Sequence, residues 1–203
     1  MDVHLVLSDL ETLDPDAREI PGDDPVMLVD YIVATHHAYI RESAPVIQQH
    51  LAKVVAAHGA RHSELPLIES QFSKVASELM LHMMKEEQVL FPYIRALGQV
   101  VSENAPPPPD MFGTVQNPIR MMEIEHQAAG DGVASIRELT RDYEPPANSC
   151  ATYRLALQEL AAFEQDLHRH VHLENNVLFP KAVELEENLG RRGSGLKCQR
   201  GDI

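Results

Sequence analysis

The stretch "LHMMKEEQVLFP" (residues 81–92) and the stretch "RHVHLENNVLFP" (residues 169–180) share the pattern His-x-x-x-Glu-x-x-Val-Leu-Phe-Pro. The two copies are 88 residues apart, counted from His82 to His170. In an α-helix, residues four positions apart lie on the same face, one turn from each other. Each copy therefore predicts a helix that turns one histidine and one glutamate to the same side.

Each copy also follows a helix that carries a histidine of its own. "ATHHAY" contains His37, which is 45 residues before His82, and "EIEHQA" contains His126, which is 44 residues before His170. The chain therefore holds an internal repeat of a helix pair. If the two pairs pack face to face, six side chains point to a common interior: His37, His82, Glu86, His126, His170 and Glu174.

Four imidazoles and two carboxylates suit a pair of first-row metal ions, with the carboxylates as bridges. This donor set favours iron, manganese or zinc over metals that prefer thiolates. A metal pair in the middle of a four-helix bundle is an established arrangement. A single His-x-x-x-Glu is a weak pattern, so the prediction depends on the repeat and on the two upstream histidines.

Apolar residues recur at helical spacing in four segments, residues 23–58, 65–98, 117–143 and 150–189. A loop with four consecutive prolines, residues 106–109, separates the second segment from the third. The fold class is therefore predicted to be all-α, an antiparallel four-helix bundle built from two helix-hairpin repeats. We expect the bundle to span residues 25–189, after an N-terminal segment (1–24) and before a disordered tail (190–203).

Local signals predict where these helices begin, end and bend. Asp23 or Asp24, then Asn117, then Asn148 or Ser149 are the expected N-caps, and Gly59 and Gly98 the expected stops. Pro45 lies inside the first segment and is expected to kink or split it. Gly130 and Gly132 are expected to weaken the third helix.

Composition excludes several classes of partner. The chain has 203 residues and a formal net charge of −14, which argues against nucleic acid and anionic membrane surfaces. We find no apolar run of about 18 residues, so no transmembrane helix is predicted. The two cysteines, Cys150 and Cys198, are far apart in sequence, which favours a reducing cytoplasm over a disulfide framework.

The remaining features of the repeat have structural interpretations. The shared Val-Leu-Phe, residues 89–91 and 177–179, is interpreted as core packing beneath the site, and Pro92 and Pro180 are expected to bend both helices alike. His36 points about 100° away from His37, which indicates a surface position or one around the site. Six other residues are assigned to solvated or chemically inert positions: His4, His50, His62, His168, His172 and Glu123. Cys150 is interpreted as an inert residue at a helix start.

The runs "HMMKEEQVLFP", "EIEHQAAG" and "HVHLENNVLFP" resemble the hemerythrin-like domain of the repair-of-iron-centres proteins, which repair iron–sulfur clusters in bacteria. The resemblance extends from about Val26 to Glu187. It implies a non-haem di-iron centre in which Glu86, Glu174 and an oxo group bridge the irons. It also makes His58 a candidate ligand, although helical rise places that residue about six turns beyond His37.

The resemblance implies a function, with an alternative from another class. The first hypothesis is repair of iron–sulfur clusters damaged by nitric oxide or oxidative stress, through iron donation or nitric oxide reduction. Its partners would be damaged iron–sulfur proteins, and a homodimer is left open. The alternative is reversible binding or sensing of dioxygen or nitric oxide. Related full-length proteins begin with a small domain that bears adjacent cysteines, so residues 1–24 are interpreted as a remnant of such a domain.

Overall fold

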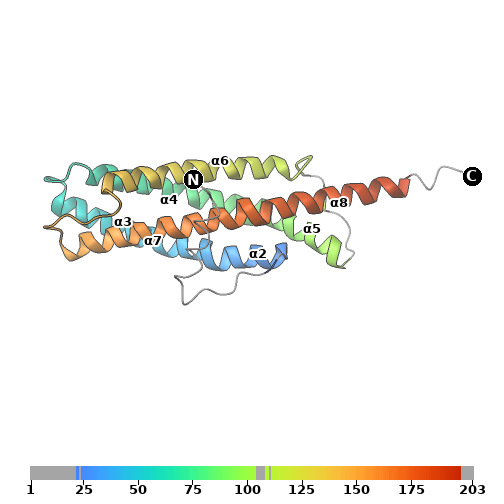
Figure 1. The fold of residues 1–203 in the computed structure, drawn as a ribbon, viewed down its shortest axis with the longest axis horizontal. Helices are drawn as coiled ribbons and strands as arrows, with labels where there is room; N and C mark the ends of the chain where they lie inside the picture. Colours follow the sequence, from blue (N-terminus) through green and yellow to red (C-terminus); the bar gives the residue numbers. More distant parts are fainter. Residues whose placement is uncertain (1–21, 23, 104–107, 110, 198–203) are drawn as a thin grey trace, which may run out of the picture.

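The computed structural model describes residues 22, 24–103, 108–109 and 111–197, where all regular structure is helical. Four long antiparallel helices lie side by side (Figure 1). The first comprises α2 (Pro25–Ile32), the π-turn η1 (Val33–His37) and α3 (Ala38–His58). The second comprises α4 (Leu65–Lys85), η2 (Glu86–Leu90) and α5 (Phe91–Glu103). The third is α6 (Gln116–Thr140), and the fourth comprises α7 (Ala151–Leu173), η3 (Glu174–Leu178) and α8 (Phe179–Lys197). The predicted all-α four-helix bundle is confirmed.

The interior consists of two apolar clusters with a polar layer between them. In one half of the bundle, α3 and α6 each pack against both α4 and α7, around residues such as Phe72 and Phe163. In the other half, α5 packs against α2 and α8, around residues such as Phe91 and Phe179. Along every helix, the switch from one cluster to the other falls where the predicted histidines and glutamates stand.

Two of the predicted helix signals work as expected and one does not. Asp24 caps α2, because its carboxylate accepts a hydrogen bond from Val26 N–H at 2.8 Å. Gly59 follows the last residue of α3. The predicted stop at Gly98 is wrong, since α5 continues to Glu103. A side chain at Gly98 would lie 3.1 Å from Val26 Cγ2, so this glycine allows α5 to approach α2 instead of ending a helix.

The predicted caps of the last two helices are wrong. Val115 precedes α6, and its N–H donates to the carboxylate of Glu186 at 3.0 Å. A side chain of α8 therefore accepts the hydrogen bond of a backbone N–H at the start of α6. Asn117 instead donates its amide to the carbonyl of Phe112. Cys150, without a side-chain capping bond, precedes α7 in place of Asn148 or Ser149. A residue distant in sequence, Glu186, therefore takes the place of the expected local cap of α6, and α7 begins without a side-chain cap.

The ends of the third and fourth helices also differ from the prediction. The third ends at Thr140 because Arg141, Asp142 and Tyr143 all have positive φ, at 53°, 59° and 61°. The fourth passes its predicted end at Leu189 and continues to Lys197. The last six residues of the predicted tail, 198–203, and most of the N-terminal segment lie outside the described residues.

The π-turns, and not the prolines, mark where the helices depart from α geometry. The first helix is not split at Pro45, which lies inside α3, and its departure from α geometry falls on η1. Pro92 and Pro180 each come one residue after the N–H that closes a π-turn, from Phe91 to Glu86 and from Phe179 to Glu174. The Leu and Phe of both copies are buried as predicted, whereas Val89 is 39% exposed, so its assignment to the core is wrong.

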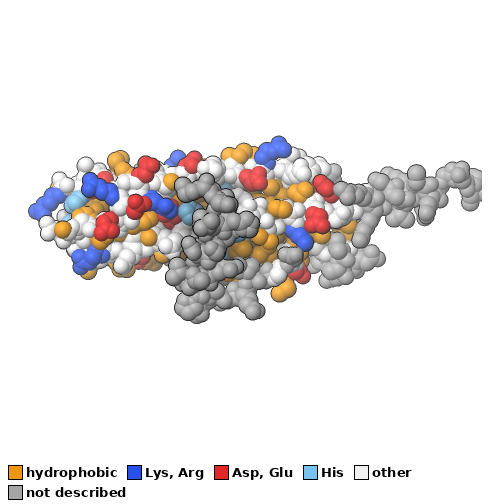
Figure 2. Space-filling model, viewed as in Figure 1, with side chains coloured by type: hydrophobic (Ala, Val, Ile, Leu, Met, Phe, Trp, Pro, Cys, Tyr) orange, Lys and Arg blue, Asp and Glu red, His pale blue; other side chains and the backbone are white. Residues whose placement is uncertain are grey.

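Charged and apolar side chains alternate over the visible face of the bundle, where Figure 2 shows Lys and Arg interspersed with Asp and Glu. Within the described ranges, none of the helices combines the length and the apolar character that a membrane crossing requires.

Two glycines of α6 face opposite environments. A Cβ at Gly132 would lie 2.4 Å from Val75 Cγ2, whereas a Cβ at Gly130 would meet no atom within 4 Å. The absence of a side chain at Gly132 therefore lets α6 lie close against α4. Gly130 has no such packing role.

This contrast predicts opposite effects of the same substitution. Gly132→Ala should lower the free energy of unfolding by about 1–3 kcal/mol, because the stiff Val75 side chain has to move. Gly130→Ala should raise it by up to about 1 kcal/mol through helix propensity. Urea unfolding monitored by circular dichroism measures both, and a Gly132→Ala protein as stable as Gly130→Ala would contradict the close approach.

Candidate metal centre

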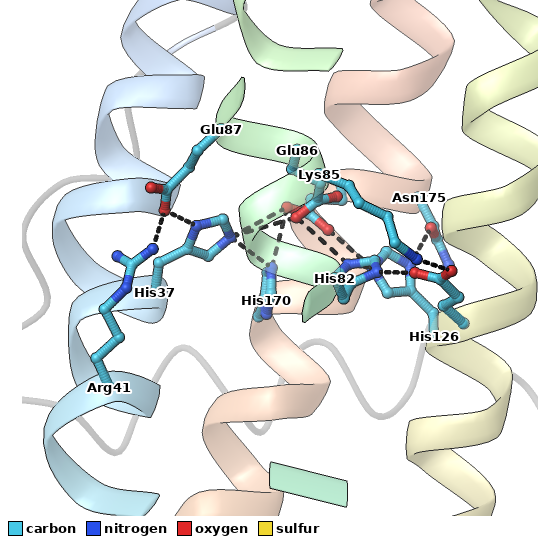
Figure 3. A network of polar contacts seen from close by, with 11 residues as sticks. His37, Arg41, His82, Lys85, Glu86, Glu87, His126, His170 and Asn175 are labelled. Carbon is cyan, nitrogen blue, oxygen red and sulfur yellow. Dashed lines mark hydrogen bonds and ion pairs between the residues drawn. The ribbon is translucent and has the colours of Figure 1, made fainter. Parts of the chain in front are cut away.

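All six predicted ligands lie in the polar layer, and each is at most 3% exposed. His37 ends η1, while Glu86 and Glu174 begin η2 and η3. His82, His126 and His170 come from α4, α6 and α7 (Figure 3). Their donor atoms form two groups, each within 4.8 Å: His37, Glu86, His170 and Glu174 in one, and His82, Glu86, His126 and Glu174 in the other. Both glutamates belong to both groups.

The histidines form two pairs whose ring nitrogens nearly touch. His37 Nε2 lies 3.2 Å from His170 Nε2, and His82 Nε2 lies 2.9 Å from His126 Nε2. Two nitrogens bound at right angles to one metal ion, each at about 2.1 Å, would be about 3.0 Å apart. Each pair therefore has the spacing that two adjacent ligands of a single ion require.

The two carboxylates lie between the histidine pairs. Glu174 turns Oε1 to His170 Nε2 and Oε2 to His126 Nε2, at 2.9 Å in both cases. Glu86 Oε2 lies 3.4 Å from His37 Nε2 and 3.3 Å from His82 Nε2. Each glutamate thus reaches both pairs, as a carboxylate that bridges two ions must.

Buried oxygen atoms without hydrogen bonds test whether this donor set fits metal ions. Both carboxylate oxygens of Glu86 are buried and accept no well-directed hydrogen bond, and neither does Oε2 of Glu174, although it faces His126 Nε2. A buried carboxylate without compensation costs several kcal/mol, so it needs a cation or donors close by. Two divalent ions, each between one histidine pair and both carboxylates, would supply that compensation. The residues present therefore fit a two-metal centre.

Further side chains orient three of the four imidazoles. Nδ1 lies 2.7 Å from Glu87 in His37, 2.9 Å from Glu125 in His82, and 2.9 Å from Asn175 in His126. A hydrogen bond donated by Nδ1–H leaves the Nε2 lone pair directed at the centre. Arg41 and Lys85 in turn pair with Glu87 and Glu125.

Sequence reasoning missed these three orienting residues. Each follows or precedes a predicted ligand directly in sequence, and each bonds to a histidine of a different helix. The available signal in the sequence was an acidic or amide residue directly beside a predicted ligand. A neighbour points about 100° away from the ligand, however, so only the packing of the helices decides which histidine it meets.

The other histidines occupy different places. His36 is 3% exposed, bonds Asp166 through Nδ1 at 2.8 Å and stacks on His170, so of its two predicted positions the one around the site is confirmed and the surface one is wrong. His58 is not brought to the other six residues, because its Nε2 lies 3.2 Å from Cys150 Sγ at the far end of α3. His50 pairs with Glu159 and His62 with Glu64, both partly buried, and His4 lies outside the described residues.

Comparison with known proteins agrees with this geometry. Residues 28–182 match the family model described as the hemerythrin HHE cation binding domain. The chain is 36% identical over 157 residues to a probable iron-sulfur cluster repair protein of Haemophilus influenzae, covering 77% of this chain but only 64% of that relative's length. It is 34% identical over 182 residues to the iron-sulfur cluster repair protein YtfE of Yersinia pseudotuberculosis and of Yersinia pestis, covering 89% of this chain and 76% of each relative.

Charges within the layer shift the protonation of the metal-free protein. Burial alone would lower the pKa of His37, but the nearby carboxylates of Glu174 and Glu86 outweigh burial and raise the pKa to about 10. For His82, burial also lowers the pKa, and Glu86 raises it to about 9. Burial would raise the pKa of Glu174, yet the charge of His170 and the close imidazoles of His126 and His170 hold it well below its usual range.

These shifts predict that the metal-free protein loses stability as the pH rises. His37 and His82 hold a proton more tightly in the folded chain, with pKa values of about 10 and 9, than at the ordinary value of 6.5. Their contribution is therefore complete below pH 6.5 and is lost as the pH rises through about 9 and 10. Urea midpoints of the chelator-treated protein should fall over this range, and His37→Gln should flatten the profile while His62→Gln leaves it unchanged.

Proposed function

The chain belongs to the hemerythrin HHE cation-binding family, and from that membership we propose that it is a di-iron protein that repairs iron–sulfur clusters damaged by nitric oxide or oxidants. The observation that carries the proposal is the pair of buried carboxylates, Glu86 and Glu174, each within reach of both histidine pairs. The names of its relatives in Haemophilus and Yersinia supply the biological role.

Iron is the metal we propose, with an oxo bridge beside the two carboxylates. Imidazole and carboxylate donors suit iron, manganese and zinc, and of these iron supports both electron transfer and cluster repair. Four protein donors per ion leave coordination positions open on each ion. When bound, two ferrous ions supply reducing electrons for nitric oxide, or a labile ion for a damaged cluster. Glu87, Glu125 and Asn175 keep the imidazoles turned toward the ions.

Damaged iron–sulfur proteins are the proposed substrates, with nitric oxide or dioxygen as small ligands. We propose a cytoplasmic location, because the chain has only two cysteines and they lie far apart in sequence. Reversible dioxygen or nitric oxide binding is the competing function, and the structure brings together four imidazoles, where oxygen-storing hemerythrins typically use five. Fewer nitrogen donors favour reactivity and metal release over storage.

Loss of one bridging carboxylate should disrupt the metal pair. We expect about two irons per wild-type chain after anaerobic reconstitution and no paired site in Glu174→Ala, because that variant lacks a donor to both ions. Iron analysis with Mössbauer spectroscopy measures the loss. Glu159→Ala, which removes a carboxylate from the same helix away from the layer, is the matched control. Unchanged iron content in Glu174→Ala would refute the assignment of the centre.

Repair itself is tested with a damaged [4Fe–4S] enzyme. The iron-loaded chain should restore nitric-oxide-treated aconitase faster and further than an equal amount of free ferrous iron, and Glu174→Ala should not. Recovery no better than that with free iron would refute the repair function. A stable and reversible oxygenated spectrum under the same conditions would support the competing storage function instead.

A further inference from the structure

A cleft of about 330 Å³ opens between α6 and the α7–η3 helix and has His126 in its wall. On one side it is lined by Glu123, Gln127 and Gly130, which share a face of α6 at spacings of four and three residues. On the other side it is lined by His168, His172 and Asn175, at the same spacings. The cleft therefore leads from solvent to a proposed metal ligand.

The two glycines of α6 account for the opening. Gly132 lets α6 lie against α4, where a Cβ would come within 2.4 Å of Val75. Gly130, which lines the cleft, has no side chain to fill the space toward α7, and a Cβ there would meet nothing within 4 Å. Close packing on one side of α6 thus accompanies a gap on the other.

Metal-binding groups line this cleft from its mouth to its base. The His168 side chain is 56% exposed, His172 and Asn175 are partly buried, and His126 is 3% exposed. His168 and His172 are four residues apart on one helix, a spacing at which two imidazoles can share one ion. Glu123 adds a carboxylate from the opposite wall, and among the described residues no Lys or Arg lines the cleft.

The two histidines at the mouth have ring nitrogens available. Asn176 donates its amide to His172 Nδ1 at 2.8 Å, which leaves His172 Nε2 without a contact from that residue. His168 Nε2 lies 4.0 Å from Glu164, beyond hydrogen-bond distance, and that carboxylate already accepts bonds from Arg137 and Tyr143. Both histidines line the same cleft as His126.

We propose that this cleft is the passage through which ferrous ions enter and leave the buried centre, with His168 and His172 as a transient binding station at its mouth. The proposal rests on the proposed function, since it assumes that the six buried residues bind two metal ions. It assigns to His168, His172 and Gly130 a role in the rate of metal exchange and none in holding the metal pair.

Exchange rates test this role without any repair assay. Co²⁺ serves as a visible probe, and stopped-flow absorbance follows its uptake by the chelator-treated chain and its removal from the loaded chain by EDTA. The cleft variants are His168→Ala with His172→Ala, which removes the station, and Gly130→Leu, which fills the gap. Both should slow uptake and removal by about tenfold, which corresponds to about 1.4 kcal/mol in the free-energy barrier to exchange. The final stoichiometry should remain two ions per chain.

Matched controls separate an effect on metal exchange through the cleft from effects of removing two histidines or replacing a helical glycine elsewhere. His50→Ala with His62→Ala removes two histidines away from the cleft, and Gly190→Leu changes another helical glycine whose Cβ would meet nothing within 4 Å. Both controls should exchange Co²⁺ at the wild-type rate. Wild-type rates in either cleft variant, with two ions bound, would overturn the passage while leaving the proposed function intact. Fewer than two ions on the wild-type chain would overturn the proposed function instead.

Discussion

Six ionisable side chains lie in one buried layer across the bundle, and the rest of the structure is arranged around that layer. Two carboxylates and four imidazoles, each at most 3% exposed, are costly to bury unless opposite charges or metal ions compensate them. The apolar clusters on either side supply the stability that the layer does not. Glu87 and Glu125 extend the compensation outward, since each joins a buried histidine to a cation, Arg41 or Lys85, nearer the surface. On two sides of the centre, a buried histidine, a partly buried glutamate and a more exposed cation thus follow one another toward the solvent.

The π-turns reconcile this polar layer with continuous apolar packing. A π-turn places one extra residue in a helical turn and shifts the faces of the residues that follow. Glu86 and Glu174 each begin such a turn, and the Leu-Phe that ends it returns to the core as Leu90 and Phe91 or as Leu178 and Phe179. The following proline has no N–H to place in the ladder, which the π-turn has already interrupted. The Leu-Phe of the repeated Val-Leu-Phe-Pro is therefore a packing signal that accompanies the ligands.

Sequence reasoning predicted the parts of this centre that depend on single helices. The i, i+4 spacing of His82 with Glu86 and of His170 with Glu174 is a property of one helix, and the repeat supplied His37 and His126. The geometric objection to His58 proved sounder than the family resemblance, since a straight α3 carries that residue to Cys150 at the far end. What sequence reasoning missed depends on contacts between helices: the burial of His36 against Asp166, the start of α6 held by Glu186, and the three residues that orient the imidazoles.

The third helix differs from the others in a way that bears on access. Like the first helix, it contributes a single ligand, His126, but it is the only one of the four whose described residues contain no π-turn. Without that widening, α6 keeps one face against α4 through Gly132 and presents the face with Glu123, Gln127 and Gly130 to the cleft. His126 is held through Asn175, an amide at the cleft wall, whereas His37 and His82 are held through carboxylates that pair with Arg41 and Lys85. The cleft lies on the side of the centre that lacks these carboxylate–cation pairs, so one helix both completes the proposed metal centre and forms a wall of the cleft that reaches it.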